Sequence, residues 1–381
     1  MKHNKYIFVI SVIFALSLTS CSKNPNEVIF NIDDINVIDI HTEFQNEYLN
    51  SSDPDSFVYN HKSELANFSN SAPNKYKVTY IVTNDLGIEA KSTWVEISEH
   101  SDMSNSYRFD GEKDYTYINN LKVNYKYYLT VNASFKTTFT SEVKEFTTKD
   151  TKIRNLDVEG VENVRDLGGY KLEGGKTYKQ GMIYRTAQYN YGGRDNDFVS
   201  APTEAGKKVL LEQLGIKTDN DLRRTKDFDG NDEVNGITSS PLGINYISCP
   251  MVFGGKNIYT QSINRDSLKL FFDSLAVESN YPIAFHCIRG TDRTGGLAYA
   301  LGALLGMSKE DLMLDYLFSN FAKITSTANN VVRANGIKSL YVKGIDDSEG
   351  STLSEKARNY LITKTGVESS TLDTIIDLLT E

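Results

Sequence analysis

The spacing of apolar residues changes near residue 150, and this change divides the 381-residue chain into two parts. Between residues 31 and 150, short runs in which apolar and polar residues alternate recur, for example in 78–82, 93–97 and 127–133. Such runs, separated by turn-forming residues, are typical of the strands of a β-sandwich. In 155–381, helical spacing alternates with short apolar runs, which indicates an α/β domain with a central, mostly parallel sheet flanked by helices.

Local signals in the second part mark individual elements. Thr203 can cap a helix over 203–214, and Gly215 can end it. The apolar run 282–286 is predicted to be a buried strand, and an apolar helix is predicted to follow it over 294–305. The order strand, short loop, helix is therefore expected in this stretch.

The first 21 residues have the features of an export signal. Basic residues stand at positions 2 and 5, the apolar stretch 6–18 is too short to span a bilayer, and the sequence LTSC follows, with Cys21 last. This ending resembles the lipobox of bacterial lipoproteins, in which the Cys becomes the acylated N-terminus; the alternative is an ordinary secretory signal with an incidental Cys. The resemblance implies a membrane-anchored protein outside the cytoplasm, in the periplasm or at the cell surface, with 22–30 as a polar tether.

The charge of the chain excludes one class of partner. It has 41 basic and 50 acidic residues, a net charge of −9, so there is no basic surplus for a nucleic-acid backbone. A small anionic substrate is compatible with this charge, because one local positive pocket can attract it. No other apolar run reaches the roughly 18 residues of a membrane span, and the sequence leaves the oligomeric state open.

The segment 286–295, HCIRGTDRTG, has the composition of a phosphate-binding loop. It lies between the predicted strand and helix, where backbone N–H groups converge and the helix dipole adds partial positive charge. Gly290 allows a tight turn. Such a nest suits a tetrahedral oxyanion.

Three side chains of this loop fit nucleophilic attack on a bound phosphate ester. The positive field lowers the pKa of Cys287, so the reactive thiolate is present at neutral pH. The planar fork of Arg293 can hold two phosphoryl oxygens. Thr294 can donate a hydrogen bond to the sulfur and ease its departure from a phospho-enzyme. The alternative interpretation is a buried structural Cys beside a surface Arg.

The spacing Cys-x5-Arg-Thr is the signature of the cysteine-dependent phosphatases, and the chain resembles a bacterial branch of them, the secreted tyrosine/serine and lipid phosphatases. Further motifs carry the resemblance in family order over about residues 155–380. They are NVRDLGGY at 163–170, GMIYRT at 181–186, LGIKT and then DLR within 214–223, and DYLFSN at 315–320.

This resemblance implies a phosphocysteine intermediate, no metal and no cofactor. It assigns Cys287 as the nucleophile, Arg293 as the phosphate clamp, and the amides of Ile288 through Arg293 as the cradle. Asp292 is the first choice for the general acid, and its carboxylate could then activate water; the alternative is a structural carboxylate that orients the loop. Asp221 is the second choice, because its Asp-Leu-Arg segment ends a strand in this branch and no Trp-Pro-Asp loop is present.

The loop departs from the branch pattern at one position. The branch has Lys where this chain has Thr291, and Lys favours additional phosphates such as those of phosphoinositides. Arg289 could restore positive charge to the rim, or it is a solvated loop residue. The leading hypothesis is therefore a phosphatase acting on phosphotyrosine or phosphoserine proteins or small phosphoesters. Its alternatives are an inositol-phosphate or phosphoinositide phosphatase and a catalytically silent surface-binding module.

Residues outside the loop have plainer interpretations. His286 is expected to pack against the loop and bond to it. Arg165 and Asp166 are expected to pair with each other near the pocket, with contact to substrate as the alternative. Arg223, close to Asp221, is a further residue that could contact substrate or assist the acid.

Two more features leave alternatives open. Cys249 is expected to be a core thiol; the alternative is a reversible disulfide with Cys287 that protects the nucleophile from oxidation. The polar stretch 189–202 is either a substrate lid or a plain loop.

Residues 117–148 resemble the C-terminal half of a fibronectin type III-like domain. Tyr127, six residues after Leu121, matches the tyrosine corner of such domains, in which the hydroxyl bonds to upstream backbone. The resemblance implies a spacer or, alternatively, a partner-binding module.

Overall fold

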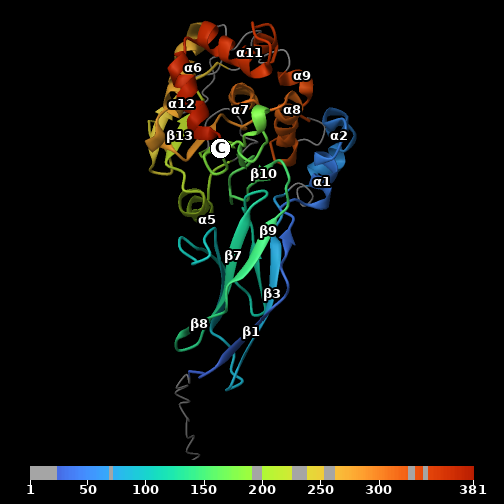
Figure 1. The fold of residues 1–381 in the computed structure, drawn as a ribbon, viewed down its shortest axis with the longest axis vertical. Coiled ribbons are helices and arrows are strands. Elements are labelled where there is room, and N and C mark those ends of the chain that lie inside the picture. Colours follow the sequence, from blue (N-terminus) through green and yellow to red (C-terminus); the bar gives the residue numbers. More distant parts are fainter. Residues whose placement is uncertain are drawn as a thin grey trace, which may run out of the picture.

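The computed structural model shows an elongated molecule in which a two-sheet part lies below a larger part made of helices around a sheet (Figure 1). The structure describes residues 24–67, 72–190, 200–224, 238–252, 262–324, 331–337 and 342–381.

The N-terminal part is a sandwich of two sheets. The first sheet has the strand order β1 (Val28–Ile32), β3 (Tyr76–Asn84), β6 (Tyr115–Ile118). The second has the order β2 (Val37–Ile38), β9 (Lys144–Thr148), β7 (Lys126–Ser134), β4 (Ser92–Ser98), β5 (Tyr107–Asp110), and β8 (Thr138–Thr140) pairs with β7. Alternating residues of both sheets, among them Val78, Tyr80, Leu129 and Val131, form one hydrophobic core. The predicted β-sandwich is thus confirmed.

Three short helices interrupt this sandwich between β2 and β3. They are α1 (Glu43–Leu49), α2 (Pro54–Asn60) and α3 (Lys62–Ala66). The prediction that 31–150 is all-β is wrong for this insertion. Thr42 forms a capping box at the start of α1, and Asp53 caps α2 directly before a Pro at its first position, which are strong local helix starts. The predicted tether 22–30 is also too long, because β1 already begins at Val28.

The inserted helices pack against the α/β part rather than against the sandwich core. The Tyr48 hydroxyl of α1 donates to the Leu314 carbonyl oxygen at 2.8 Å. Asp55 of α2 forms a 2.6 Å ion pair with Arg333. The rings of Tyr48 and Phe321 lie 5.1 Å apart within a larger group of aromatic side chains. The insertion therefore joins the two parts of the molecule.

A second junction lies at the end of the sandwich. The Gln180 side chain bonds to both backbone groups of Val123, accepting from its N–H at 2.8 Å and donating to its carbonyl oxygen at 2.9 Å. Buried Arg154 donates to the carbonyl oxygens of Leu121 and Asn120 at 3.1 and 2.6 Å. These backbone contacts fix the sandwich against the first strands of the α/β part.

The α/β part is built on a six-stranded sheet. Its order is β10 (Arg154–Asn155), β11 (Arg165–Asp166), β12 (Ile183–Thr186), β15 (Ile283–His286), β13 (Thr218–Asp221), β14 (Asn245–Ser248). The four strands from β12 to β14 are parallel, and the β10–β11–β12 edge is antiparallel. The prediction of a mostly parallel sheet is confirmed.

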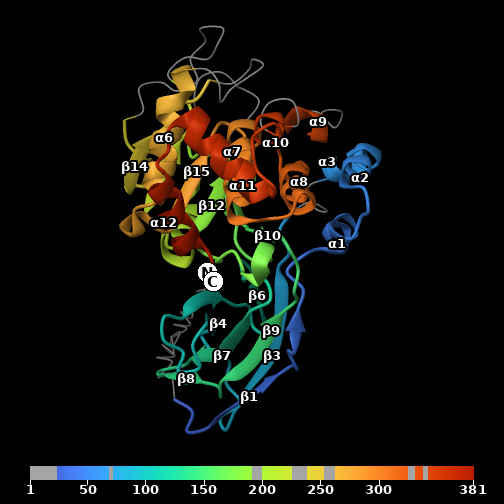
Figure 2. The ribbon, with the colours of Figure 1, turned by 45° about the horizontal axis from the view of Figure 1, so that its top comes forward.

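Helices cover both faces of this sheet. The described helices are α5 (Glu204–Lys208) with a π-helical extension (Val209–Gln213), α6 (Ser262–Leu275), α7 (Asp292–Leu305), α8 (Lys309–Leu317) with a 3-10 turn (Phe318–Phe321), α9 (Ala334–Ile337), α10 (Lys343–Asp346), α11 (Leu353–Tyr360) with a π-helical extension (Leu361–Thr365), and α12 (Ser369–Leu379). Figure 2 shows α7, α11 and α12 on one side of β12 and β15. On the other face, Tyr184 and Ala284 pack with Leu210 and Leu214 of the segment that Thr203 caps.

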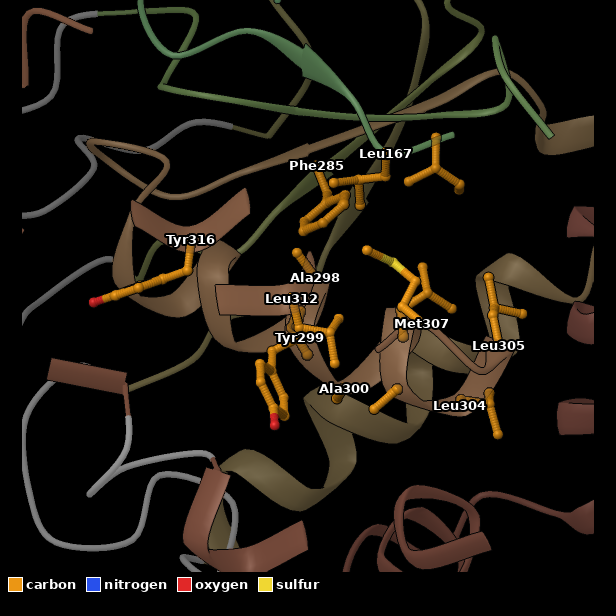
Figure 3. Close-up of a cluster of buried hydrophobic side chains, with 14 of the residues drawn as sticks. Leu167, Phe285, Ala298, Tyr299, Ala300, Leu304, Leu305, Met307, Leu312 and Tyr316 are labelled. Atoms are coloured by element: carbon orange, nitrogen blue, oxygen red, sulfur yellow. The ribbon is translucent and has the colours of Figure 1, made fainter. Parts of the chain in front are cut away.

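Helix α7 is the centre of the larger core. All of its residues from Arg293 to Leu305 are buried, and Gly306 ends it in the left-handed conformation. Figure 3 shows Leu304 and Ala298 of this helix in the same cluster as Phe285 of β15. A helix buried all round holds its N-terminus, and so the loop before it, in one place. Among the described residues, no helix has both the length and the apolar character needed to cross a membrane.

Candidate active site

The loop between β15 and α7 has the predicted order of strand, turn and helix. Cys287 directly follows β15, and α7 begins at Asp292. Gly290 has φ +68, and a Cβ at this position would lie 2.3 Å from the Thr186 carbonyl oxygen. Only glycine therefore lets the loop approach β12 this closely.

Cys287 is buried and has a lowered pKa. Burial alone would raise the pKa of the thiol, but the charge of Arg293 and hydrogen bonds from the side chain and the backbone of Thr294 bring it below its ordinary value. Asp292 acts weakly in the opposite direction. The net effect favours the thiolate, which is the nucleophilic form.

Arg293 lies inside the site and is held by backbone oxygens. The residue is 3% exposed. Its Nη1 donates to the carbonyl oxygens of Leu222 at 3.3 Å and Met251 at 3.1 Å. Both acceptors lie beyond the carboxyl ends of β13 and β14, the edge where ligands bind in parallel sheets. The guanidinium lies near enough to Cys287 for its charge to lower the pKa of the thiol, and its role as a phosphate clamp stays a prediction.

Asp292 carries the character expected of a general acid. Burial raises the pKa of its carboxyl above the ordinary value, although Arg293, Arg289 and Arg185 oppose this change. A raised pKa means that the carboxyl keeps its proton to higher pH. This direction is the one that a general acid needs, and the role of Asp292 stays a prediction.

Asp221 lies in a different environment and is unsuited to this role. Burial opposes ionisation, but His286 and Arg223 lower the pKa of Asp221 to about 2. Arg223 contacts both carboxylate oxygens, with Nη2 2.7 Å from Oδ2, and the Tyr246 hydroxyl donates to Oδ2 at 3.1 Å. A carboxylate so fully paired has no proton to give at neutral pH.

His286 belongs to the same cluster of buried ionisable side chains as Asp221. Its Nε2 lies 3.0 Å from Asp219 Oδ1, and its Nδ1 donates to the Cys287 carbonyl oxygen at 3.1 Å. Burial would lower the pKa of His286, but Asp221 and Asp219 raise it above the ordinary value. As expected, His286 packs under the loop and bonds to it. Arg223 also bonds to Gln188, so it supports the wall of the site.

The predicted pair between Arg165 and Asp166 is wrong. Neighbouring residues on a strand point to opposite faces, and each finds its own partner. Arg165 Nε lies 3.0 Å from Asp315, and Asp166 pairs with Arg154 at 2.7 Å. Asp166 also accepts from the Gly168 N–H at 2.8 Å, so it orders the turn after β11.

The sequence interpretation missed Arg185, which lies directly behind the loop. It is fully buried, its Nη1 lies 2.5 Å from Asp315 Oδ2, and its Nη2 donates to the Gly290 carbonyl oxygen at 2.6 Å. The sequence signal that could have indicated its role is an Arg within a short apolar strand, where a charged side chain needs a partner. Its partner Asp315 stands 130 positions further along the chain, so pairing could not be read from local sequence.

The remaining predicted loop residues differ in burial. Thr291 and Thr294 are buried, whereas Ile288 and Arg289 are half-buried. The Thr291 hydroxyl donates to the Arg289 carbonyl oxygen at 3.4 Å. Thr291 thus supports the loop from within and does not extend to its rim as a Lys would.

Predictions away from the loop have different outcomes. Cys249 is buried and free, like Cys287, and burial raises its pKa to about 12, as expected of a core thiol. Its reversible disulfide with Cys287 stays a prediction. Most of 189–202 and the whole of the signal segment with Cys21 lie outside the described residues. Within the described ranges, no group of three or more His, Cys, Asp and Glu side chains is arranged to hold a metal ion.

Comparison with known proteins agrees with this geometry. The model of a family described as the tyrosine phosphatase family matches residues 156–381, more than half of the chain. The chain belongs to the tyrosine phosphatase family. A protein of Cupriavidus necator named as a tyrosine-protein phosphatase is 24% identical over 188 residues, which are 44% of this chain and 63% of that protein. The chain thus spans less than two thirds of the length of this curated relative.

Two solved structures are similar at lower identity. The core catalytic domain of the PP-IP phosphatase SIW14 of S. cerevisiae is 20% identical with a TM-score of 0.28, over 45% of this chain and 85% of that chain. TpbA of P. aeruginosa is 15% identical with a TM-score of 0.27, over 53% of this chain and 90% of that chain.

Proposed function

We propose that this member of the family hydrolyses phosphomonoesters, with phosphotyrosine and phosphoserine as its preferred groups, through a phosphocysteine intermediate. The observation that supports it most directly is the opposite tuning of two neighbouring groups. The pKa of Cys287 is lowered and that of Asp292 is raised. The two shifts favour a thiolate on Cys287 and a protonated carboxyl on Asp292, the forms that a nucleophile and a general acid require.

In the first step the Cys287 thiolate attacks phosphorus. The S–P bond forms while the P–O bond to the leaving group breaks. The Arg293 guanidinium and the loop N–H groups balance the charge on the other phosphoryl oxygens. Asp292 transfers its proton to the leaving oxygen, which departs as a neutral alcohol or phenol.

In the second step water attacks the phosphocysteine. The Asp292 carboxylate accepts a proton from this water as its oxygen bonds to phosphorus and the S–P bond breaks. Inorganic phosphate leaves, and Cys287 returns to the thiolate that Thr294 and Arg293 stabilise. Water is therefore the second reactant, and its oxygen ends in the inorganic phosphate.

Inositol phosphates are the second candidate substrates. Half-buried Arg289 could supply positive charge at the rim for additional phosphates. Thr291 argues against inositol phosphates as substrates, because it is buried and uncharged where the branch has a Lys. We therefore rank phosphotyrosine and phosphoserine above polyphosphorylated inositols, and both above a silent binding module.

We further propose that Cys21 is acylated and that the protein acts outside the cytoplasm on its anchor. The LTSC sequence after a short apolar stretch supports this. The sandwich is proposed to be a fibronectin type III-like spacer. The Lys122 N–H donates to the Tyr127 hydroxyl at 2.8 Å, the contact expected of a tyrosine corner. Cys21→Ala should remove incorporation of a labelled fatty acid in cells; equal labelling of this variant would contradict the anchor.

A substrate panel tests the catalytic proposal. Released phosphate is measured with phosphotyrosine peptides, phosphoserine peptides and inositol hexakisphosphate, for the full chain and for Cys287→Ser. We expect turnover of the peptides that Cys287→Ser reduces to the assay background while folding is retained. Cys249→Ser is the matched control, because it changes the other buried thiol and should keep turnover. Activity in Cys287→Ser, or release from none of the substrates by the wild-type chain, would contradict the proposal.

A further inference from the structure

The loop carbonyls determine where the loop N–H groups point. In a trans peptide the C=O and the following N–H lie on opposite sides of the unit. A nest for an anion needs consecutive N–H groups turned toward the bound oxygens. Groups that bind the carbonyl oxygens from outside therefore keep the N–H groups turned inward.

Three consecutive loop carbonyls are held in this way. The Ile288 oxygen accepts from the Gln188 backbone N–H at 3.0 Å. The Arg289 oxygen accepts from Asn163 Nδ2 at 2.9 Å, and the Gly290 oxygen accepts from Arg185 Nη2 at 2.6 Å. The N–H groups of these same three peptide units belong to residues 289, 290 and 291, the middle of the cradle.

The two side-chain donors belong to one network. Arg185 is held by Asp315, whose other oxygen lies 3.0 Å from Arg165 Nε. Arg165 Nη1 donates in turn to Asn163 Oδ1, which leaves the Asn163 amide nitrogen directed to the loop. Asn163 has φ +59, a left-handed conformation that Asn tolerates better than most residues.

This network also carries charge. Burial would raise the pKa of Asp315, but Arg165 and Arg185 lower it below its ordinary value. Two buried guanidinium groups therefore share one carboxylate. The pKa of Arg185 falls to about 10 through burial and through Arg165, and the Cys287 charge acts against this fall. The group therefore holds about one net positive charge near the sulfur. Burying such a charge is costly, and a bound dianionic phosphate would offset it.

We propose that Arg185 and Asn163 are positioning residues that hold the phosphate loop in its anion-binding conformation, and that Arg185 adds positive charge beneath the bound phosphoryl group. This inference rests on the proposed function, since it concerns the same loop. Arg185 acts through the Gly290 carbonyl and touches no reacting atom, so it differs from Arg293 in role. Asn163 acts in the same way through Arg289.

The test measures oxyanion binding and thiol ionisation separately from turnover. Tungstate affinity is measured by calorimetry, and the apparent pKa of Cys287 is taken from the pH dependence of its alkylation by iodoacetamide. We expect Arg185→Met to weaken tungstate binding about tenfold or more, as loss of a charge-assisted bond predicts, and to raise the apparent pKa of Cys287. Arg185→Lys should recover part of both, because it restores the charge.

Arg154→Met is the matched control. Arg154 is also buried, ion-paired and bonded to backbone oxygens, but its partners are Asp166, Leu121 and Asn120 rather than the loop. This variant should lose stability and keep both tungstate affinity and the thiol pKa. Wild-type values in Arg185→Met, or equal losses in Arg154→Met, would overturn the proposal.

Asn163→Gly covers the case in which Arg185→Met does not fold. Glycine accepts φ +59, so this change removes one loop donor without backbone strain. We expect a severalfold loss of tungstate affinity, and an unchanged affinity would overturn the proposal. A wild-type chain that binds tungstate through Arg185 but releases phosphate from no substrate would contradict the proposed function and leave this inference standing.

Discussion

The sandwich and the α/β part both bury polar side chains, but the groups differ in charge. In the described residues of the sandwich and its insertion, the buried polar groups are hydroxyls, amides and one imidazole, from His41, Gln45, Thr93, Ser98, Thr116, Asn120, Thr130, Asn132 and Thr148. Burial lowers the pKa of His41 to about 4, so this imidazole is neutral as well. Besides neutral groups such as those of Asn163 and Thr294, the α/β part also buries ionisable side chains, those of Arg154, Arg165, Asp166, Arg185, Asp219, Asp221, Arg223, His286, Arg293 and Asp315.

This contrast separates what a fold needs from what a site needs. Neutral bonds suffice between the sheets, where the Tyr80 hydroxyl lies 2.9 Å from the hydroxyls of both Thr93 and Thr116. Buried charges contribute little net stability, because desolvation offsets their attraction. Most of those in the α/β part surround the loop before α7. Their concentration there indicates that they serve anion chemistry.

The largest expected effect comes from the charged region, in Asp292→Asn. Removing a general acid should lower kcat about 10²–10⁴-fold on a phosphotyrosine peptide. In the wild type, activity should rise with pH as Cys287 ionises below its ordinary pKa, and fall as Asp292 loses its proton above its ordinary pKa. The variant should keep the rise and lose the fall, as measured in steady-state pH profiles.

A substrate comparison controls this prediction. An aryl phosphate whose leaving group needs no proton should be affected much less by Asp292→Asn. Equal losses on both substrates would mean that Asp292 orients the loop and does not act as an acid.

The next prediction tests how much the buried ion pairs contribute to the free energy of unfolding. Asp315→Asn leaves Arg165 and Arg185 buried without their shared carboxylate, so the free energy of unfolding should fall by about 3–5 kcal/mol. Chemical denaturation measures this loss. Asp311→Asn, on the same helix, breaks a pair with half-exposed Lys152 and should change the value by less than about 1 kcal/mol. Similar losses in both variants would remove the distinction between the two kinds of pair.

A cavity in the sandwich should separate stability from activity. Leu129 is fully buried between the sheets, so Leu129→Ala should lower the free energy of unfolding by about 3 kcal/mol. Because Leu129 belongs to a different hydrophobic cluster from Cys287, kcat of the folded variant should equal that of the wild type. Denaturation and steady-state kinetics on the same preparation measure both. A large fall in kcat would show that the sandwich does more than support the enzyme.

The smallest expected effect lies in a single neutral bond. Tyr127→Phe removes the acceptor of the Lys122 N–H and should lower the free energy of unfolding by about 1 kcal/mol. Tyr117→Phe, at a half-exposed position, is the control and should stay within about 0.5 kcal/mol of the wild type. A loss in Tyr127→Phe no larger than the control would show that the corner contributes nothing to stability.

Sequence reasoning succeeded where the signal is local. The strand before Cys287, the turn at Gly290 and the helix after it depend on residues within a short stretch, and all are present. The strands of the sandwich follow from alternation in the same way. These elements could be predicted because period and turn chemistry act over a few residues.

The errors arise where partners are distant or elements are short. Helices α1 to α3 have only five to seven residues each, so their stability comes from packing that the sequence does not show. The pairing of Arg165 with Asp315 spans 150 positions. Arg165 and Asp166 are adjacent on one strand, so their side chains point to opposite faces. This alternation could have excluded their pairing from the sequence alone.

The insertion of α1 to α3 has a mechanical consequence. The chain leaves the sandwich, contacts the α/β part through Tyr48 and Asp55, returns to β3, and crosses again before β10 (Figure 1). Three crossings resist bending far more than one linker, because any hinge must break aromatic and backbone contacts at two separate places. We therefore expect the loop before α7 to keep a constant distance from the sandwich.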